Sequence, residues 1–463
     1  MNLNKKLLVK TIGATLLTCA TASQAANWLM LQGTEPDGQS EQANVWGFIQ
    51  VQYQKDNSDP NATGGYIPPK LIGPDLNSQQ AFNVNRARIG VRGTGLPLDS
   101  SVNYFILAEF GNNGITAAND SPHITDASIT VSKIPGARIR AGLFKYPGAE
   151  EGLQAIHVFD YINFTSVTNQ LLLERFPNNN GAYEAQANLP PTTLPAQNSM
   201  SAFNSPVGAF RDVGIQVFDT FKVNDWEHSY AVMIGNGNGL NFGNQDENYD
   251  TYLYWSSELV FGGKGGRREG LKMFAWNQSG KRLLDSTPCA DPTACTAADY
   301  NPTEHDRDRS GLGVKYLKKP FRVSAEYMQG EGMIFVGQDK STFDINTAVA
   351  GGNGADGKAD GYYLEGGWYI PSTDWEIDLR YDVYNRLTDD VAFTGGPNIG
   401  KTFEMKFETI TLGAQYHINK KTRINMEIAD RTFEAVDWAS ATGPNDNLDG
   451  VSTRYGIQLT HIF

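Results

Sequence analysis

The sequence predicts an all-β fold, a transmembrane antiparallel β-barrel of about sixteen strands with a long third loop folded into its lumen. Three observations predict it. Apolar and polar residues alternate with period two over segments of roughly ten residues, as in strands with one face toward lipid. Short and long connections between these segments alternate along the chain. The last segment ends on an aromatic residue, Phe463.

Residues 1–25 are predicted to be a cleaved signal peptide. Lys5 and Lys6 precede an apolar run over 7–17, and small residues stand near position 25. The run is too short to span a bilayer as a helix, which favours a secretory signal over an anchor. Cys19 resembles a lipoprotein acylation site, although Thr18 stands where Gly, Ala or Ser is normally required. The transmembrane β-barrel domain is then expected to cover 26–463.

Composition excludes several classes of protein. The formal net charge is −13, so there is no electrostatic case for nucleic acid as a partner. No stretch of 26–463 approaches 18 uninterrupted apolar residues, which excludes a helical membrane protein. The chain is rich in Gly (48), Tyr (20) and Phe (23), as expected of a barrel in which every second residue faces lipid.

The alternation is clearest over 373–385. Trp375, Ile377 and Leu379 alternate there with charged residues, which a helix would scatter around its circumference and a strand places on one face. Sixteen such segments are predicted, at 44–54, 82–93, 101–111, 124–133, 137–145, 210–221, 226–236, 249–261, 270–282, 308–318, 321–332, 360–370, 373–385, 405–418, 421–434 and 451–463.

The connections support a membrane barrel over a soluble sandwich. Short turns such as 134–136, 319–320 and 419–420 alternate with long loops such as 146–209 and 333–359. Outer-membrane barrels have an even number of strands, short periplasmic turns and longer external loops. An even count places both termini in the periplasm. A closed barrel also leaves no unpaired backbone edge in hydrocarbon.

The C-terminal segment resembles the signature by which outer-membrane proteins are accepted for barrel assembly. Alternate residues from Val451 to Leu459 share one face with the terminal Phe463. His461 departs from this signature, because that place is usually aromatic or apolar.

Three stretches carry a family resemblance. The first, residues 85–93, contains an Arg-x-Arg-hydrophobic-Gly segment and is followed by the predicted strand 104–111. The second comprises residues 126–127 and 138–147, which are predicted to form the next hairpin. The third comprises residues 173–175 and 210–216, where the chain returns from the third loop. Their order and spacing resemble the phosphate- and pyrophosphate-selective porins of the O/P type. The resemblance implies a sixteen-stranded barrel, usually a homotrimer, whose third loop constricts the pore.

The third loop is predicted to be the constriction loop, over 146–209. It is the longest connection, and a loop of this size without function would be unusual. Its first half is apolar, which indicates that it packs inside the lumen or against a neighbour. Its part 177–206, rich in Pro and Asn, is typical of an exposed excursion or a trimer contact.

Basic residues are the first candidates for lining the channel. Strand parity puts Arg86, Arg88 and Arg92 on one face and Arg138 and Arg140 on one face of another strand. An arginine on the lipid face costs roughly 2–4 kcal/mol at mid-bilayer, so these side chains are expected to face the lumen and contact anions. The alternative is that they pair with inward carboxylates such as Glu109, Asp126 or Glu326. The resemblance adds the residues around the constriction loop, here only Lys145 and Arg175.

Acidic residues are predicted on the same inner face. Glu109 and Asp126 lie near the arginines, and four more acids stand on the segment 373–385, namely Asp374, Glu376, Asp378 and Asp382. Together with the loop carboxylates they make strict phosphate selectivity doubtful. A mixed-charge pore for small polar or anionic solutes fits better.

Other chemistry has little support in the sequence. Cys289 and Cys295 match no haem or zinc spacing and could close a loop disulfide or remain free thiols. Acidic stretches at 356–360 and 445–450 lack the full calcium-loop spacing and are more typical of solvated turns. The six histidines form no metal-ligand pattern. We therefore expect no metal, no cofactor and no enzymatic activity; a phospholipase would need a grouped nucleophile and base.

The function predicted is that of a porin in the Gram-negative outer membrane, with lipid and lipopolysaccharide around it. It would pass small polar or anionic solutes, with phosphate-type oxyanions possible. The alternative is a barrel sheath for a periplasmic or extracellular partner complex, which would need a wide, unobstructed lumen.

Overall fold

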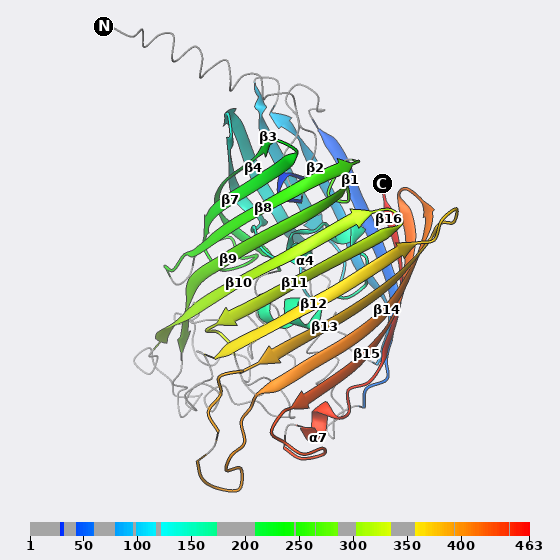
Figure 1. The fold of residues 1–463 in the computed structure, drawn as a ribbon. Helices are drawn as coiled ribbons and strands as arrows, with labels where there is room; N and C mark the ends of the chain where they lie inside the picture. The colour runs from blue at the N-terminus through cyan, green and yellow to red at the C-terminus, as the bar shows by residue number, and fades with distance from the viewer. Residues whose placement is uncertain are drawn as a thin grey trace.

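The computed structural model describes residues 28–31, 43–59, 79–95, 99–116, 122–173, 209–244, 247–263, 265–285, 302–334, 357–392, 394–443 and 445–463. In this part of the chain sixteen strands form one closed antiparallel barrel (Figure 1). Each strand pairs with the next, and β1 pairs with β16 to close the ring. The predicted fold class is confirmed.

The strands match the sixteen predicted segments within a few residues at most ends. They are β1 Asn44–Asp56, β2 Gln80–Gly95, β3 Asp99–Glu109, β4 His123–Ile134, β5 Ala137–Lys145, β6 Arg211–Val223, β7 Trp226–Gly235, β8 Asp250–Gly262, β9 Glu269–Asp285, β10 Pro302–Lys318, β11 Phe321–Glu331, β12 Lys358–Tyr369, β13 Trp375–Arg386, β14 Met405–Asn419, β15 Thr422–Ala435 and β16 Arg454–Ile462.

The connections alternate between short and long, as predicted. The turns after β4, β6, β10 and β14 are short, whereas the chain between β5 and β6 runs from 146 to 210. All short turns therefore lie at one end of the barrel, here called the short-turn end, and the other connections lie at the long-loop end. Among described residues, no helix is long and apolar enough to cross a membrane.

Alternation along the strands separates two faces. On β13, Ile377 and Leu379 are exposed on the outer wall, whereas Glu376, Asp378 and Asp382 are almost fully buried on the inner face. Apolar side chains thus form the outer surface and charged side chains the inner one, because successive residues of a strand point to opposite faces.

Among the strand ends that differ from prediction, two affect charged residues. Strand β10 begins at Pro302, six residues before the predicted start, and its added residues include the charged Asp306 and Arg307. These residues extend the antiparallel pairing of β10 with β9 at the long-loop end. Their sequence has no apolar alternation, so the prediction did not include them in the strand. Strand β13 begins at Trp375, so Asp374 lies exposed in the preceding turn and not on the inner wall.

The first part of the third loop lies inside the barrel. After β5 the chain forms the short helix α4 (Glu150–Leu153), the 3₁₀ turn η1 (Ile156–Val158) and the π-helical turn η2 (Thr168–Leu172). We call residues 146–173 the inner segment. Figure 1 shows α4 within the barrel. Ile156, Phe159 and Tyr161 of the inner segment form a small buried cluster with Phe48, whereas most of its other buried apolar residues belong to a larger cluster with inward wall residues. Residues 177–206 lie outside the described part.

A second piece of chain joins the larger of these clusters. The short helix α2 (Trp28–Leu31) has Trp28, Leu29 and Met30 buried in it. The predicted signal peptide 1–25 lies outside the described residues.

Candidate functional site

The inner segment is hydrogen-bonded to wall carboxylates far away in sequence. The backbone N–H of Ile162 donates to Glu427 Oε2 at 2.8 Å, and Asn163 Nδ2 donates to the other oxygen of the same carboxylate. The N–H of Ser166 donates to Asp382 Oδ1 at 2.7 Å. Charged acceptors strengthen such bonds. The acids of β13 and β15 therefore hold the backbone of this segment against the wall.

Arg322 is the centre of a buried ion cluster. Its guanidinium lies 3.1 Å from Asp160 of the inner segment, 3.3 Å from Glu365 of β12, and 3.2 and 2.5 Å from Glu376 and Asp378 of β13. The arginine side chain is 1% exposed. One inward cation thus joins three wall carboxylates to the carboxylate of the inner segment.

Two further arginines hold the same stretch. Arg267 Nη1 lies 2.7 Å from Asp160 Oδ1. Arg423 donates from Nη2 to the carbonyl oxygens of His157, at 3.2 Å, and of Phe159. Arg423 and Arg322 are the second residues of their strands, directly after short turns. Residues 157–160 therefore lie near the short-turn end.

The inner segment then returns toward the other end. Arg309 Nε donates to the carbonyl oxygen of Leu171 at 3.1 Å and its Nη1 to that of Gly332 at 2.9 Å, beyond the end of β11. Because β11 runs from the short turn toward the long-loop end, Leu171 lies near the long-loop end. The segment follows the inner wall through most of the barrel's depth.

Helix α4 is held by a lysine pair on the neighbouring strands β9 and β10. Glu150 accepts from Lys272 Nζ at 2.7 Å and from Lys315 Nζ at 3.1 Å. Its backbone N–H donates to Glu326 at 3.2 Å, and Glu326 also accepts from Trp276 at 2.7 Å and Tyr363 at 2.8 Å. The inner segment is thus bound to both the β9–β10 wall and the β11–β15 wall.

Wall glycines receive apolar side chains of the inner segment. A Cβ built on Gly330, Gly361 or Gly456 would lie within 2.8 Å of a side-chain carbon of Leu171, Val167 or Ile162, respectively. Any larger residue would displace the segment or the wall. The distribution of inward glycines over β11, β12 and β16 therefore follows the path of the inner segment.

The predicted arginines of β2 face inward, and each has a partner. Arg86 Nη1 donates to Gln50 Oε1 at 3.0 Å. Arg88 Nε lies 2.6 Å from Glu109 Oε2. Arg92 Nη2 donates to the carbonyl oxygen of Leu31 at 3.2 Å. A bulge at β2 aligns Gln50 with Arg86 and Val51 with Val84, and it keeps the arginines on the inner face.

The basic residues of β5 also point inward. Arg138 forms an ion pair with Asp219 at 3.1 Å. Arg140 is 1% exposed, donates to Thr130 Oγ1 at 3.2 Å and lies 4.4 Å from the ring centre of Phe218. Lys145 Nζ donates to the carbonyl oxygens of Gly152 and Gln154 at 2.8 and 2.7 Å. Arg175, Cys289 and Cys295 lie outside the described residues.

The predicted acids divide between two roles. Glu109 pairs with Arg88, and Asp126 accepts two hydrogen bonds from Arg211, at 3.0 and 3.2 Å. Glu376 and Asp378 belong to the Arg322 cluster, and Asp382 holds Ser166. Asp374 is exposed in its turn, so it joins none of these groups.

Sequence reasoning missed the inward cations of the later strands. They include Arg267 of the β8–β9 turn and, on the strands, Lys272, Arg309, Lys315, Arg322 and Arg423. Arg322 has the inward parity of Glu326 on its strand, the signal already used for Arg86 and Arg88. Their partners on the inner segment could not be found this way, because periodicity does not pair a loop residue with a strand.

Comparison with known proteins adds the fold. No protein-family model and no curated protein sequence matches the chain. Among solved structures, the chain is similar to the outer membrane protein OmpT of Vibrio cholerae with loop L8 deleted, at 10% identity and a TM-score of 0.51, over 92% of this chain and 99% of that one.

Two further solved structures are similar at lower TM-scores. An anion-selective porin from Comamonas acidovorans has 15% identity and a TM-score of 0.47, over 92% of this chain and 100% of that one. The outer membrane channel DcaP of Acinetobacter baumannii has 12% identity and a TM-score of 0.48, over 94% and 100%. The likeness to the Vibrio structure supports the barrel fold and gives no information on a solute.

Proposed function

We propose that this protein is an outer-membrane porin, a channel for passive passage of small polar or anionic solutes. One observation carries the proposal: the outer face of a closed barrel is mainly apolar, and its inner face carries many polar and charged residues. An outer face of this kind belongs in hydrocarbon, and a polar interior is the usual interior of a porin. Phosphate-type oxyanions are within the proposed range.

The inner charges support a mixed-charge pathway over a strictly anionic one. Arg88, Arg138 and Arg211 each pair with a carboxylate, at 2.6 to 3.1 Å. Among the described residues, Arg86 forms no ion pair with a carboxylate; its guanidinium donates a hydrogen bond to the neutral side chain of Gln50. The predicted anion contacts remain Arg86, Arg88, Arg92, Arg138, Arg140, Lys145 and Arg175, with the paired members contributing less net charge to the pathway.

The remaining assignments belong to the same proposal. Residues 1–25 would direct secretion, the short-turn end would face the periplasm with both termini, and the barrel would assemble as a homotrimer in lipid and lipopolysaccharide. The constriction would be formed by 146–209, whose described part follows the inner wall. A sheath for a partner complex has less support, because it needs an unobstructed lumen and the inner segment occupies part of it.

The test of the channel is electrical. Purified, folded protein added to a planar lipid bilayer is expected to produce stepwise increases in current, grouped in threes if the trimer inserts as a unit. Heat-denatured protein is the control. Silent bilayers from protein that still shows the heat-dependent gel mobility of a folded barrel would contradict the proposal.

The anion contacts are tested by the reversal potential across a salt gradient. Arg86→Gln and Arg140→Gln are expected to lower the permeability of chloride relative to potassium. The double variant Arg88→Gln with Glu109→Gln removes a neutral pair and serves as a matched control, with little change expected. Unchanged ratios in the two single variants would assign these arginines a structural role.

A further inference from the structure

Helix α2 lies inside the barrel mouth at the short-turn end. Leu31 accepts a hydrogen bond at its carbonyl from Arg92, and Met30 Sδ lies 3.5 Å from Arg138 Nη1. Arg92 stands near the last residues of β2 and Arg138 near the first of β5, both beside short turns. Since both arginines face inward, α2 lies within the ring of strands at that end.

The other side of α2 is anchored to the β8–β9 turn. The indole ring of Trp28 lies against Gly266, where an added Cβ would come within 2.5 Å of the ring. Trp28, Leu29 and Met30 are 6%, 2% and 8% exposed. The β8–β9 turn and β2 stand on nearly opposite sides of the sixteen-strand ring, so α2 and its contacts reach across the mouth.

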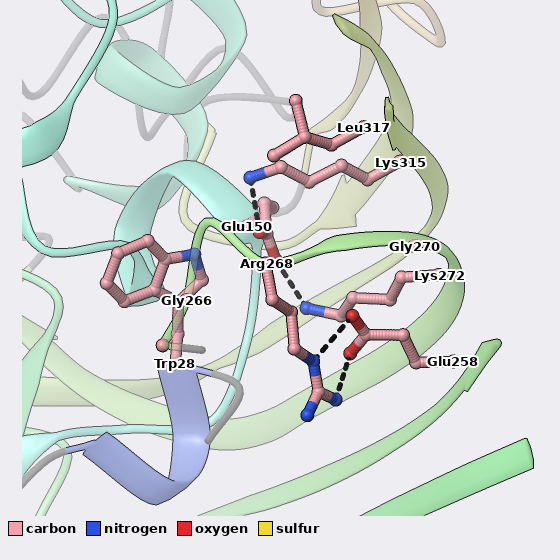
Figure 2. A pocket seen from close by; sticks show the side chains of 10 residues that line it. Trp28, Glu150, Glu258, Gly266, Arg268, Gly270, Lys272, Lys315 and Leu317 are labelled. Carbon is pink, nitrogen blue, oxygen red and sulfur yellow. Dashed lines mark hydrogen bonds and ion pairs between the residues drawn. The ribbon is translucent and has the colours of Figure 1, made fainter. Parts of the chain in front are cut away.

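Trp28 also covers a charged cavity. Figure 2 shows its ring beside Gly266, to one side of the charged side chains that run from Lys315 through Glu150 to Lys272. The cavity has a volume of about 20 Å³, room for about one water. Its lining adds Leu317 and the buried pair of Arg268 with Glu258. A solute entering from the short-turn end would meet Trp28 before it met these charges.

The contacts of α2 differ from those of the inner segment. The inner segment is tied to the wall by ion pairs and carboxylate hydrogen bonds, whereas the sequence of α2, Trp-Leu-Met-Leu, is uncharged. Its contacts include a carbonyl hydrogen bond, an arginine–sulfur contact and apolar packing.

We propose that residues 28–31 form a plug that closes the lumen at the short-turn end, with Trp28 as the side chain that seals the charged cavity. The proposal rests on the channel function and adds a moving part to it. Displacement of α2 would open the mouth and expose Lys272, Lys315 and Glu150 to solute, while the inner segment stays bound to the wall.

Labelling of a cysteine behind Trp28 tests the plug without any current. In a background with the three native cysteines changed to Ser, Leu317→Cys is treated with a small charged thiol reagent in detergent, and its modification is followed by mass spectrometry. Adding Trp28→Ala is expected to accelerate labelling by at least ~10-fold, because loss of a large buried side chain changes an opening equilibrium by that factor or more. Trp28→Phe, which keeps a ring over the cavity, should behave nearly as the parent.

Controls and currents separate the possible failures. Trp438→Ala, in the loop after β15, should leave labelling of Leu317→Cys unchanged. In bilayers, Trp28→Ala should give larger steps than the parent. Equal labelling rates with and without Trp28, in folded barrels, would overturn the plug. If Trp28→Ala labelled faster but neither the parent nor Trp28→Ala gave current in bilayers, the plug would be supported and the channel function would be contradicted.

Discussion

Arg322 shows how one side chain can organise an interior built from charges. Four carboxylates lie within 3.3 Å of its guanidinium, and both sides of each contact are almost entirely removed from solvent. A buried pair adds little net stability over an apolar one, but removal of one partner leaves the other charges uncompensated. The main contribution of Arg322 is therefore that its charge compensates these four carboxylates and allows them to be buried.

Replacement of Arg322 by Gln should destabilise the barrel by about 3–5 kcal/mol, because several buried acids lose their counter-ion together. The measurement is the urea midpoint of unfolding, followed by gel mobility of the folded form. Lys133→Gln is the control: its ion pair with Asp99 is solvent-exposed, and exposed pairs contribute about 0–1 kcal/mol. Equal midpoints for the two variants would mean that Asp160, Glu365, Glu376 and Asp378 are compensated by other cations.

Parity along a strand was enough to place most of the predicted side chains. The inward direction of Arg86, Arg88 and Arg140 follows from alternation alone, since a lipid-facing arginine is costly. The partners do not follow. Asp126 pairs with Arg211, which lies beyond the third loop in the sequence. Asp374 falls in a turn because β13 begins at Trp375, two residues later than predicted. Pairing depends on register and on the path of a loop, which alternation does not encode.

Among the elements, strands were predictable and the inner segment only in part. Strand patterns repeat over about ten residues and are bounded by turn residues, so several positions on each face carry the same signal. The inner segment has short, irregular turns, α4, η1 and η2, held by tertiary contacts. Its apolar content predicted burial. Its path from Asp160 at one end to Leu171 at the other needed the structure.

The fit between the inner segment and β16 can be tested at Gly456. A Cβ there would lie 2.8 Å from Ile162 Cδ1, and the next nearest side-chain atom, Glu427 Cγ, would be 3.5 Å away. Gly456→Ala should cost about 1–3 kcal/mol of unfolding free energy through overpacking. Adding Ile162→Val, which removes that one carbon, should recover most of the loss. Urea unfolding of the single and double variants measures both effects.

Gly366→Ala is the matched control, since the nearest atom to a Cβ at that glycine is 3.6 Å away, an ordinary contact. It should unfold with the parent midpoint. If Gly366→Ala and Gly456→Ala lost the same stability, the cost would come from strand propensity and not from the inner segment. A double variant no more stable than Gly456→Ala would lead to the same conclusion.

At the scale of the whole molecule, the seam between β1 and β16 decides whether the sheet has an edge. The N–H of Phe463 donates to the carbonyl oxygen of Gly47 at 3.0 Å, and its ring covers Gly47, where a Cβ would lie 2.5 Å from ring carbon Cζ. An unsealed seam would leave backbone groups unpaired in hydrocarbon. The terminal aromatic residue is thus part of the closure.

Phe463→Ala is therefore expected to lower the yield of folded barrel and to reduce stability by about 1 kcal/mol, as fits a half-buried ring. Heat-dependent gel mobility measures the yield. Phe463→Tyr keeps the ring over Gly47 and should fold as the parent does. If the alanine variant folded equally well, closure would depend on the β1–β16 backbone ladder alone.

The path of the inner segment also constrains the order of events in time. Ile162 bonds to Glu427, and Ser166 to Asp382, partners more than 200 positions later in the chain. Contacts at such separations form slowly, because the chain between them must be ordered first. A segment that lines the interior from one end to the other must enter while the sheet is still open. Joining of β1 to β16 would then come last, as the step that traps the segment inside.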